Sequence, residues 1–189
     1  IVIACSETLP AGSRMKLVWG KGIKAANGTP TEREESFVYK VREPFKATLS
    51  CEREKAGTPC SPLSAITLNF NAAFDAKLLA KFRLKMPDGV RKPIDPNEKS
   101  SEKEAVFQSV SFAPPFPQNA ELVIETPAAL KDEAGRVLVN AASFPLKSRT
   151  GSLPPLAKFP GNFGIVELKE GGVLPVTLRN VEASLKTGR

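Results

Sequence analysis

The sequence contains no histidine, and it has only one tryptophan, one tyrosine and two methionines among its 189 residues. The absence of histidine excludes Ser-His-Asp and Cys-His nucleophile pairs and removes the commonest metal ligand. No run of about 18 apolar residues occurs, so we expect no membrane-spanning helix in these residues. We therefore expect a protein that is not an enzyme and that needs no metal and no cofactor.

The net charge of +7 comes from 27 lysines and arginines against 20 acidic residues. A basic total can mark a partner of nucleic acid or of anionic membrane. Here the basic residues are scattered singly, usually beside acidic ones, as in Arg33-Glu34-Glu35. No stretch interleaves them with aromatic residues as a stacking platform would. We interpret the charge as a solvated, slightly basic surface and predict no nucleic-acid partner.

Two of the three cysteines, Cys51 and Cys60, bracket a polar loop that contains Gly57 and Pro59. Such a short loop lets two strand ends approach to disulfide distance, which predicts a Cys51–Cys60 disulfide and an oxidising compartment. Two free thiols on an exposed loop are the alternative. A zinc site is not expected, because two cysteines without histidine or a second cysteine pair do not supply four ligands.

Short strands dominate the pattern, whereas 17 prolines and 13 glycines argue against long helices. The one helical signal, at 74–80, would make two turns at most. The stretch 81–86 alternates and then meets Pro87-Asp88-Gly89, a turn signal. Many short strands bounded by Gly, Pro, Asn or Asp predict an all-β fold of the β-sandwich type, and they lie at 15–19, 36–41, 66–70, 81–86 and 120–125.

Few residues suggest chemistry. The carboxylate pairs Glu34-Glu35 and Asp132-Glu133 lie in polar loop or strand-edge segments without a signal for a cleft. Asp88 and Asp95, with Asp132, match no known calcium-loop spacing. Gly20-Lys21-Gly22 lacks the ending of a nucleotide-binding loop and is interpreted as a turn. The sequence thus names no catalytic, cofactor-binding or metal-ligating residue.

An internal repeat appears when the chain is shifted by 107 positions. In this alignment Cys5, which ends a short apolar run resembling a lipoprotein processing site, falls on Phe112. We therefore interpret Cys5 as a buried strand residue. Seven identities occur over roughly 34 ungapped positions, namely Pro10/Pro117, Lys24/Lys131, Gly28/Gly135, Ser36/Ser143, Phe37/Phe144, Lys40/Lys147 and Arg42/Arg149.

The period fits tandem immunoglobulin-sized modules of about 100 residues. We expect residues 1–46 to be the C-terminal half of a first β-sandwich module and residues 47–150 to be a complete immunoglobulin-like module. Residues 151–189 are expected to be a linker and the first hairpin of a following module, with strands near 162–168 and 174–179. On this interpretation the chain is a fragment of a longer multidomain protein.

Several segments resemble the N-terminal region of the large bacterial alpha-2-macroglobulin family proteins. The most specific pieces are Trp19-Gly20-Lys21-Gly22 and Cys51-Glu52-Arg53-Glu54, and the matches extend over nearly the whole chain. The remaining pieces are Leu9-Pro10-Ala11-Gly12, Pro44-Phe45, the stretch 159–167 and the stretch 174–181.

The resemblance implies tandem macroglobulin-like β-sandwich modules in a periplasmic protein whose parent is anchored to the inner membrane. The family is thought to trap proteases: cleavage of a bait segment triggers closure, and in many members a Cys-x-Glu-Gln thioester captures the attacker. Cys51-Glu52-Arg53-Glu54 echoes that motif but ends in Glu, so it lacks the side-chain amide from which a thioester forms.

The expected function is therefore a non-catalytic scaffold segment of a broad-spectrum endopeptidase inhibitor. Its expected partners are the neighbouring modules of the same chain and, through the full-length protein, target proteases. The alternative is an immunoglobulin-like repeat segment of a surface adhesin or ligand-binding protein, because such modules serve many unrelated functions on one fold.

Overall fold

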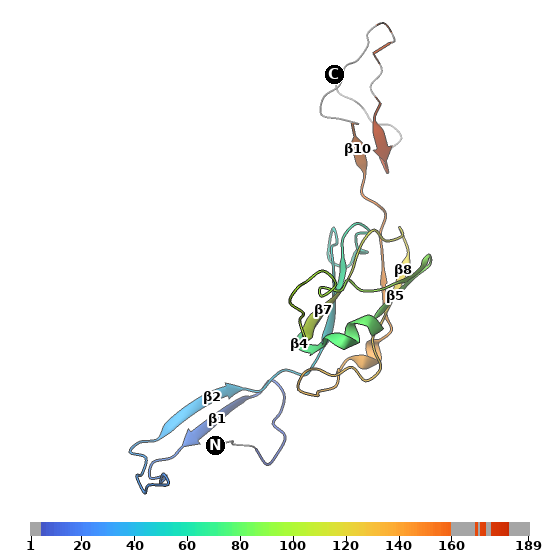
Figure 1. Ribbon diagram of the computed structural model, residues 1–189. Coiled ribbons are helices and arrows are strands. Elements are labelled where there is room, and N and C mark those ends of the chain that lie inside the picture. Colours follow the sequence, from blue (N-terminus) through green and yellow to red (C-terminus); the bar gives the residue numbers. More distant parts are fainter. Residues whose placement is uncertain (1–4, 160–168, 170, 173–174, 182–189) are drawn as a thin grey trace.

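The computed structural model describes residues 5–159, 169, 171–172 and 175–181. Over these residues the chain forms eleven strands and two short 3-10 helices, and every named strand pairing is antiparallel. The predicted all-β fold is confirmed. Figure 1 shows an N-terminal hairpin, a central pair of sheets and a small C-terminal pair of strands that follow one another along an extended molecule.

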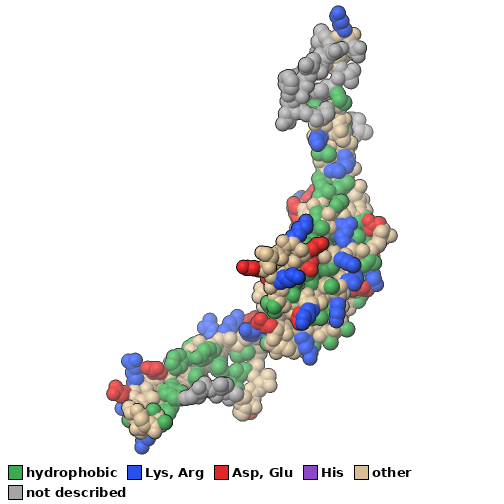
Figure 2. Space-filling view, in the orientation of Figure 1, with side chains coloured by type: hydrophobic (Ala, Val, Ile, Leu, Met, Phe, Trp, Pro, Cys, Tyr) green, Lys and Arg blue, Asp and Glu red, His purple; other side chains and the backbone are tan. Residues whose placement is uncertain are grey.

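The N-terminal hairpin pairs β1 (Arg14–Trp19) with β2 (Glu35–Lys40), and Arg14 lies opposite Lys40. Its strands are mostly exposed, and Val38 keeps 68% of its surface accessible. Figure 2 shows hydrophobic side chains gathered along this arm of the molecule. An apolar residue on a strand that is exposed this far contributes little burial energy, because the stabilisation scales with the area removed from water.

The central unit is sandwich-like and consists of a three-stranded sheet and a four-stranded sheet. The strand order of the first sheet is β3-β4-β7, and that of the second is β6-β5-β8-β9. The bounds are Ala47–Cys51 for β3, Ile66–Asp75 for β4, Arg83–Met86 for β5, Gly89–Arg91 for β6, Val106–Phe112 for β7, Glu121–Glu125 for β8 and Leu146–Arg149 for β9.

One hydrophobic core lies between the two sheets. Side chains that alternate along the strands supply it, as Ile66 and Leu68 do on β4 and as Leu122 and Ile124 do on β8, all four without exposed surface. Complete burial of such a side chain stabilises by about 1.5–3 kcal/mol. A chain of phenylalanine rings in contact, with centroids 5.0–6.5 Å apart, fills one end of the core: Phe45, Phe70, Phe74, Phe82 and Phe107.

The predicted helix at 74–80 begins later and is tighter than expected. β4 continues through Phe74, which is buried and pairs with Phe107, and the 3-10 helix η1 (Ala76–Lys81) follows. The Asp75 carboxylate accepts a hydrogen bond from the Lys77 N–H at 2.8 Å and so caps η1. The aromatic contact with the core therefore overrides the weak local helix signal.

The remaining elements are short. The predicted turn at Pro87-Asp88 joins β5 to β6, which confirms that interpretation. A second 3-10 helix, η2 (Ala141–Ser143), precedes β9. The C-terminal pair consists of β10 (Leu156–Lys158) and β11 (Thr177–Arg179). β11 overlaps the strand predicted at 174–179, whereas the strand predicted at 162–168 lies outside the described residues.

The internal repeat has a counterpart in the structure. The bridge between Lys24 and Pro30 recurs 107 residues later between Lys131 and Val137. In both copies the glycine N–H, of Gly28 or of Gly135, donates to the carbonyl three residues earlier at 2.9 Å. Both glycines have a positive φ, which a residue with a side chain rarely adopts. The loop that follows β1 and the loop that follows β8 thus turn in the same way.

The ungapped alignment is wrong, however, over the last strand of each copy. β1 and β2 place Arg14 opposite Lys40, whereas β8 and β9 place Glu121 opposite Arg149, so the offset there is 109 rather than 107. The second copy holds two additional residues in the segment that contains η2. A shift of two residues keeps the same side chains on the inner face of a strand, so the fold accommodates it. The identities at Ser36, Phe37, Lys40 and Arg42 are therefore not structural equivalences.

The prediction that Cys5 is a buried strand residue is also wrong. Cys5 is an exposed free cysteine outside any strand, and its Sγ lies 3.9 Å from the Met15 Sδ. Its sequence counterpart Phe112 is fully buried in the central core. The difference follows from the surroundings, because Phe112 lies between two sheets and Cys5 lies beside a single hairpin.

Candidate functional site

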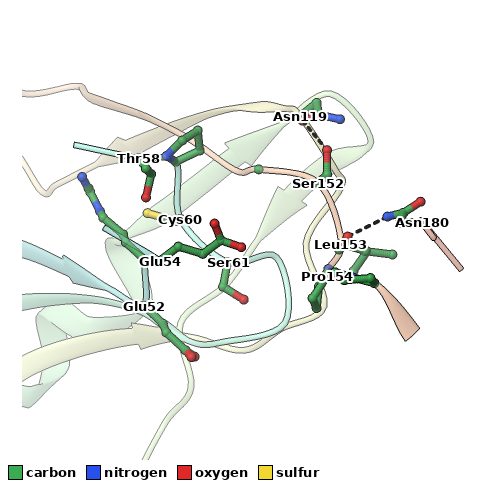
Figure 3. Close-up of a pocket in the computed structure, with 14 residues that line it drawn as sticks. Glu52, Glu54, Thr58, Cys60, Ser61, Asn119, Ser152, Leu153, Pro154 and Asn180 are labelled. Atoms are coloured by element: carbon green, nitrogen blue, oxygen red, sulfur yellow. Dashed lines mark hydrogen bonds between the residues drawn. The ribbon is translucent and has the colours of Figure 1, made fainter. Parts of the chain in front are cut away.

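A cleft of about 660 Å³ lies at the C-terminal end of the central unit, where the chain leaves it toward β10. Figure 3 shows the two walls of the cleft: the loop after β3 forms one, and the segment after β9 forms the other. Asn180, next to β11, contributes a further side. The lining residues are Glu52, Arg53, Glu54, Thr58, Pro59, Cys60, Ser61, Asn119, Gly151, Ser152, Leu153, Pro154, Pro155 and Asn180.

The predicted disulfide between Cys51 and Cys60 is present beside this cleft, with the two Cα atoms 5.6 Å apart. Cys51 ends β3, the edge strand of the three-stranded sheet. Cys60 forms a parallel bridge with Thr150, directly after β9, the edge strand of the four-stranded sheet. The disulfide therefore joins the same edge of two facing sheets by a covalent bond.

Backbone hydrogen bonds reinforce this connection. The Cys60 N–H donates to the Arg149 carbonyl at 2.8 Å, and the Gly151 N–H donates to the Cys60 carbonyl at 2.9 Å. The hydroxyl of Thr150, which is fully buried, accepts from the Ala120 N–H at 3.0 Å and donates to the Pro117 carbonyl at 2.5 Å. These bonds connect the segment after β9 with the segments around Cys60 and Ala120. They therefore fix the chain where it leaves the sandwich.

Side chains connect this point to the C-terminal pair of strands. The Asn180 side-chain amide donates to the Leu153 carbonyl at 2.6 Å, and the Ser152 hydroxyl donates to the Asn119 amide oxygen at 3.2 Å (Figure 3). Both asparagines have a φ of 51°, a conformation in which asparagine is enriched. The Leu153 N–H donates to the Gln118 amide oxygen at 2.9 Å. The chemistry of the cleft is thus that of a hydrogen-bonded joint between two units.

A second joint lies at the opposite end of the sandwich, where the N-terminal hairpin meets it. The Asp132 carboxylate is buried and forms an ion pair with Arg136, with an N–O distance of 2.6 Å. It also accepts hydrogen bonds from the backbone N–H groups of Ala134 and Arg136. Arg136 in turn donates to the carbonyl of Glu43, in the segment after β2, at 2.7 Å. Arg42 and Glu133 add an exposed ion pair across the same joint.

The environment of Asp132 controls its protonation. Burial alone would raise the pKa of its carboxyl group, because it disfavours the charged form. The hydrogen bonds from Arg136 and Ala134, together with the charge of the Arg136 guanidinium, outweigh that effect and hold the pKa of Asp132 below its ordinary value. Asp132 is therefore a charged acceptor that organises the loop and, through Arg136, the hairpin.

Of the residues that the sequence singled out, only Cys51 and Cys60 are brought together in the structure. Asp88 lies in the β5–β6 turn, and Asp95 caps a turn by accepting from the Asn97 N–H. No group of three or more His, Cys, Asp or Glu side chains that could hold a metal ion occurs among the described residues. Within that same part of the chain, no helix is long and apolar enough to cross a membrane.

Sequence reasoning missed both joints. Asp132 was considered only as one of a carboxylate pair and as a calcium ligand, although its spacing of four residues from Arg136 across Gly135 was a usable signal for a closed, ion-paired loop. Asn180 and Gln118 gave no local signal, because their partners are 27 and 35 residues away.

No family model, no curated protein and no solved structure matches this chain.

Proposed function

We propose that this chain is a non-catalytic scaffold segment, in which β units are fixed one after another in a longer assembly. The observation that carries the proposal is the pair of joints at opposite ends of the central sandwich. One joint holds the N-terminal hairpin through Arg136 and Glu43, and the other holds the C-terminal strands through Asn180 and Leu153. A chain whose most specific contacts connect successive units has the organisation expected of a spacer.

We further propose that the units are immunoglobulin-like modules and that the parent is an alpha-2-macroglobulin-like protease trap of the bacterial periplasm, anchored to the inner membrane. The segments that resemble this family support the proposal, and the Cys51–Cys60 disulfide is compatible with an oxidising compartment. In such a protein this segment would contact neighbouring modules, and the full-length protein would contact the proteases.

The experiment is an incubation of the full-length parent with a broad-specificity protease, with and without methylamine pretreatment, followed by denaturing electrophoresis. We expect a covalent adduct of the parent and the protease that methylamine abolishes. Shielding of the protease from a large substrate, without an adduct, would indicate a trap that lacks the thioester. Neither an adduct nor shielding would exclude the trap and favour an adhesin or ligand-binding array.

A variant of the parent tests the scaffold role of this segment within the trap. Asp132→Asn weakens the joint that reaches Glu43, whereas Asp88→Asn changes the same residue type in the exposed β5–β6 turn. We expect Asp132→Asn to reduce protease capture and Asp88→Asn to leave it unchanged. Equal capture by both variants would show that this joint contributes nothing to closure.

A further inference from the structure

One face of the N-terminal hairpin carries an apolar row. Residues opposite one another in an antiparallel pair point to the same side of the sheet. The register pairs Met15 with Tyr39 and Leu17 with Phe37, and Trp19 follows on the same face opposite Glu35. Phe37 and Tyr39 remain 44% and 48% exposed. Met15, Leu17 and Trp19 are partly buried, so the open part of this face lies along β2. An apolar face that stays open in this way marks a surface that packs against something else.

The second copy of the repeat shows an equivalent face that is covered. At the offset of 107, Met15 and Leu17 correspond to Leu122 and Ile124 on β8, which have no exposed surface. Ile23, in the loop after β1, is 40% exposed, whereas its counterpart Leu130 is 3% exposed. The difference between the copies lies in the cover, since the sheet β3-β4-β7 packs on β8 through the common core.

The chain also enters both hairpins in the same way. The Ser13 carbonyl accepts from the Val41 N–H at 2.8 Å, and its counterpart, the Ala120 carbonyl, accepts from the Thr150 N–H at 3.0 Å. One residue earlier, Gly12 and Asn119 both have a positive φ. The backbone therefore enters the two hairpins through the same local turn.

We infer that the apolar face of β1 and β2 is one half of a β-sandwich, and that it packs against an antiparallel sheet formed by the polypeptide joined directly ahead of residue 1. The order of the second copy assigns this occupant, because there the covering strands β3, β4 and β7 all precede β8 in the chain. The covering sheet presents a face rich in aliphatic and aromatic side chains, as β4 does with Ile66, Leu68 and Phe70. This inference rests on the part of the proposed function that places the chain in a longer polypeptide of β units, but not on the protease-trap role.

The energetics of the hairpin favour such a cover. A two-stranded hairpin without a packed face is marginally stable in water. The described contacts of this arm with the sandwich lie at its base, at Arg42 and Glu43. Within the arm the Cys5 Sγ lies 3.9 Å from the Met15 Sδ, so the described residues cover the apolar row only in part. A second copy that met this row with its own hairpin would offer a two-stranded face, which has less apolar area than a three-stranded sheet.

Trp19 makes the inference measurable, because it is the only tryptophan in the sequence and lies on the apolar row. Acrylamide quenching of its fluorescence is compared between the 189-residue chain and the same chain extended by its native upstream polypeptide, over a length comparable with residues 47–112. We expect quenching to fall several-fold in the extended chain, with a blue shift of the emission. Unchanged quenching would overturn the inference. So would shielding that already occurs in the 189-residue chain and grows with its concentration, which would assign the face to a second copy.

A matched pair of variants in the extended chain separates packing on this face from a general effect of the extension. Leu17→Asp places a charge on the apolar row, whereas Val18→Asp places it on the opposite, exposed face of the same strand. We expect Leu17→Asp to restore quenching to the level of the shorter chain and Val18→Asp to leave Trp19 shielded. Equal shielding in both variants would also overturn the inference. Circular dichroism and thiol counting report that the central unit stays folded in both variants.

Discussion

The two hairpins of this molecule follow the same path and have opposite surroundings. β1 and β2, like β8 and β9, pair antiparallel and enclose a loop with the same bridge and the same glycine turn. Yet Ile124 is completely buried, whereas its counterpart Leu17 is only partly buried, on a face whose β2 residues are exposed. The backbone path is therefore set by local features, the alternating strand and the positive-φ glycine, whereas burial is set by the sheet that packs on top.

This difference separates two sources of stability within one chain. Alternation in β1 specifies which face turns inward, but a face stabilises only when water is removed from it. In β8 the same alternation is stabilising, because the three-stranded sheet packs on the apolar face. Equivalent substitutions in the two parts of the molecule should therefore change the free energy of unfolding by different amounts.

The largest inequality is expected between Ile124→Ala and Leu17→Ala. Ile124→Ala removes a fully buried side chain and leaves a cavity, which should lower the free energy of unfolding of the central unit by about 2–5 kcal/mol. Leu17→Ala in the 189-residue chain should lower it by less than about 0.5 kcal/mol, since its side chain lies outside the central core. Urea unfolding followed by circular dichroism measures both. Equal losses would show that the hairpins are energetically alike and that the contrast in burial has no consequence.

The same contrast explains how far the sequence could predict the fold. Local signals predicted the strands around Leu17, Leu68 and Ile124, as well as the Pro87-Asp88 turn, because alternation and turn chemistry act over a few residues. Cys5 was wrongly predicted as buried because burial is a property of the surroundings, which an alignment with Phe112 does not carry over.

Two further features lay beyond sequence reasoning. The two-residue offset of β9 was hidden because matches such as Lys40 with Lys147 score well without a gap. The fold tolerates this offset because a shift of two residues leaves the same side chains on the inner face of the strand. The candidate site was half predicted. Cys51 and Cys60 are close in sequence, so their bridge could be foreseen, but Asn180 and Leu153 meet only through the tertiary fold.

The disulfide should give the next largest difference in stability between the two regions. It lies in the central unit, and the N-terminal hairpin has no described counterpart. Breaking a bond that closes a loop of ten residues, Cys51 to Cys60, should lower the free energy of unfolding by about 2–3 kcal/mol. Cys51→Ala/Cys60→Ala tests this in urea, with Cys5→Ala as the control that should leave the unfolding midpoint unchanged, since Cys5 is exposed. Alkylation of the denatured wild-type chain should count one thiol without reductant and three with it. Three thiols without reductant would show that the bridge does not form in the protein.

The smallest inequality concerns the two glycine turns. In the second turn the Asp132 carboxylate accepts hydrogen bonds from three donors. In the first turn the equivalent residue is Ala25, and the turn is closed by backbone hydrogen bonds and by the Asn27 side chain. Asp132→Asn removes the charge but keeps the shape of the side chain. It should lower the free energy of unfolding by about 1–2 kcal/mol at pH 7, because hydrogen bonds to an ionised acceptor are the stronger ones. Ala25→Gly serves as the comparison in the uncharged turn and should leave the stability of the central unit unchanged.

The pH dependence of this loss follows from the sign of the shift. Because the folded state holds the pKa of Asp132 below the ordinary value of 3.8, the folded state binds its proton less readily than the unfolded chain does. The stabilisation is therefore fully present above that ordinary value and disappears as the pH falls through the lower folded pKa. The difference between wild type and Asp132→Asn should accordingly stay constant from neutral pH to about pH 5 and shrink below about pH 4. A difference that is the same at pH 7 and at pH 3 would mean that the carboxylate charge does not stabilise the second turn, and the two turns would then differ in sequence alone.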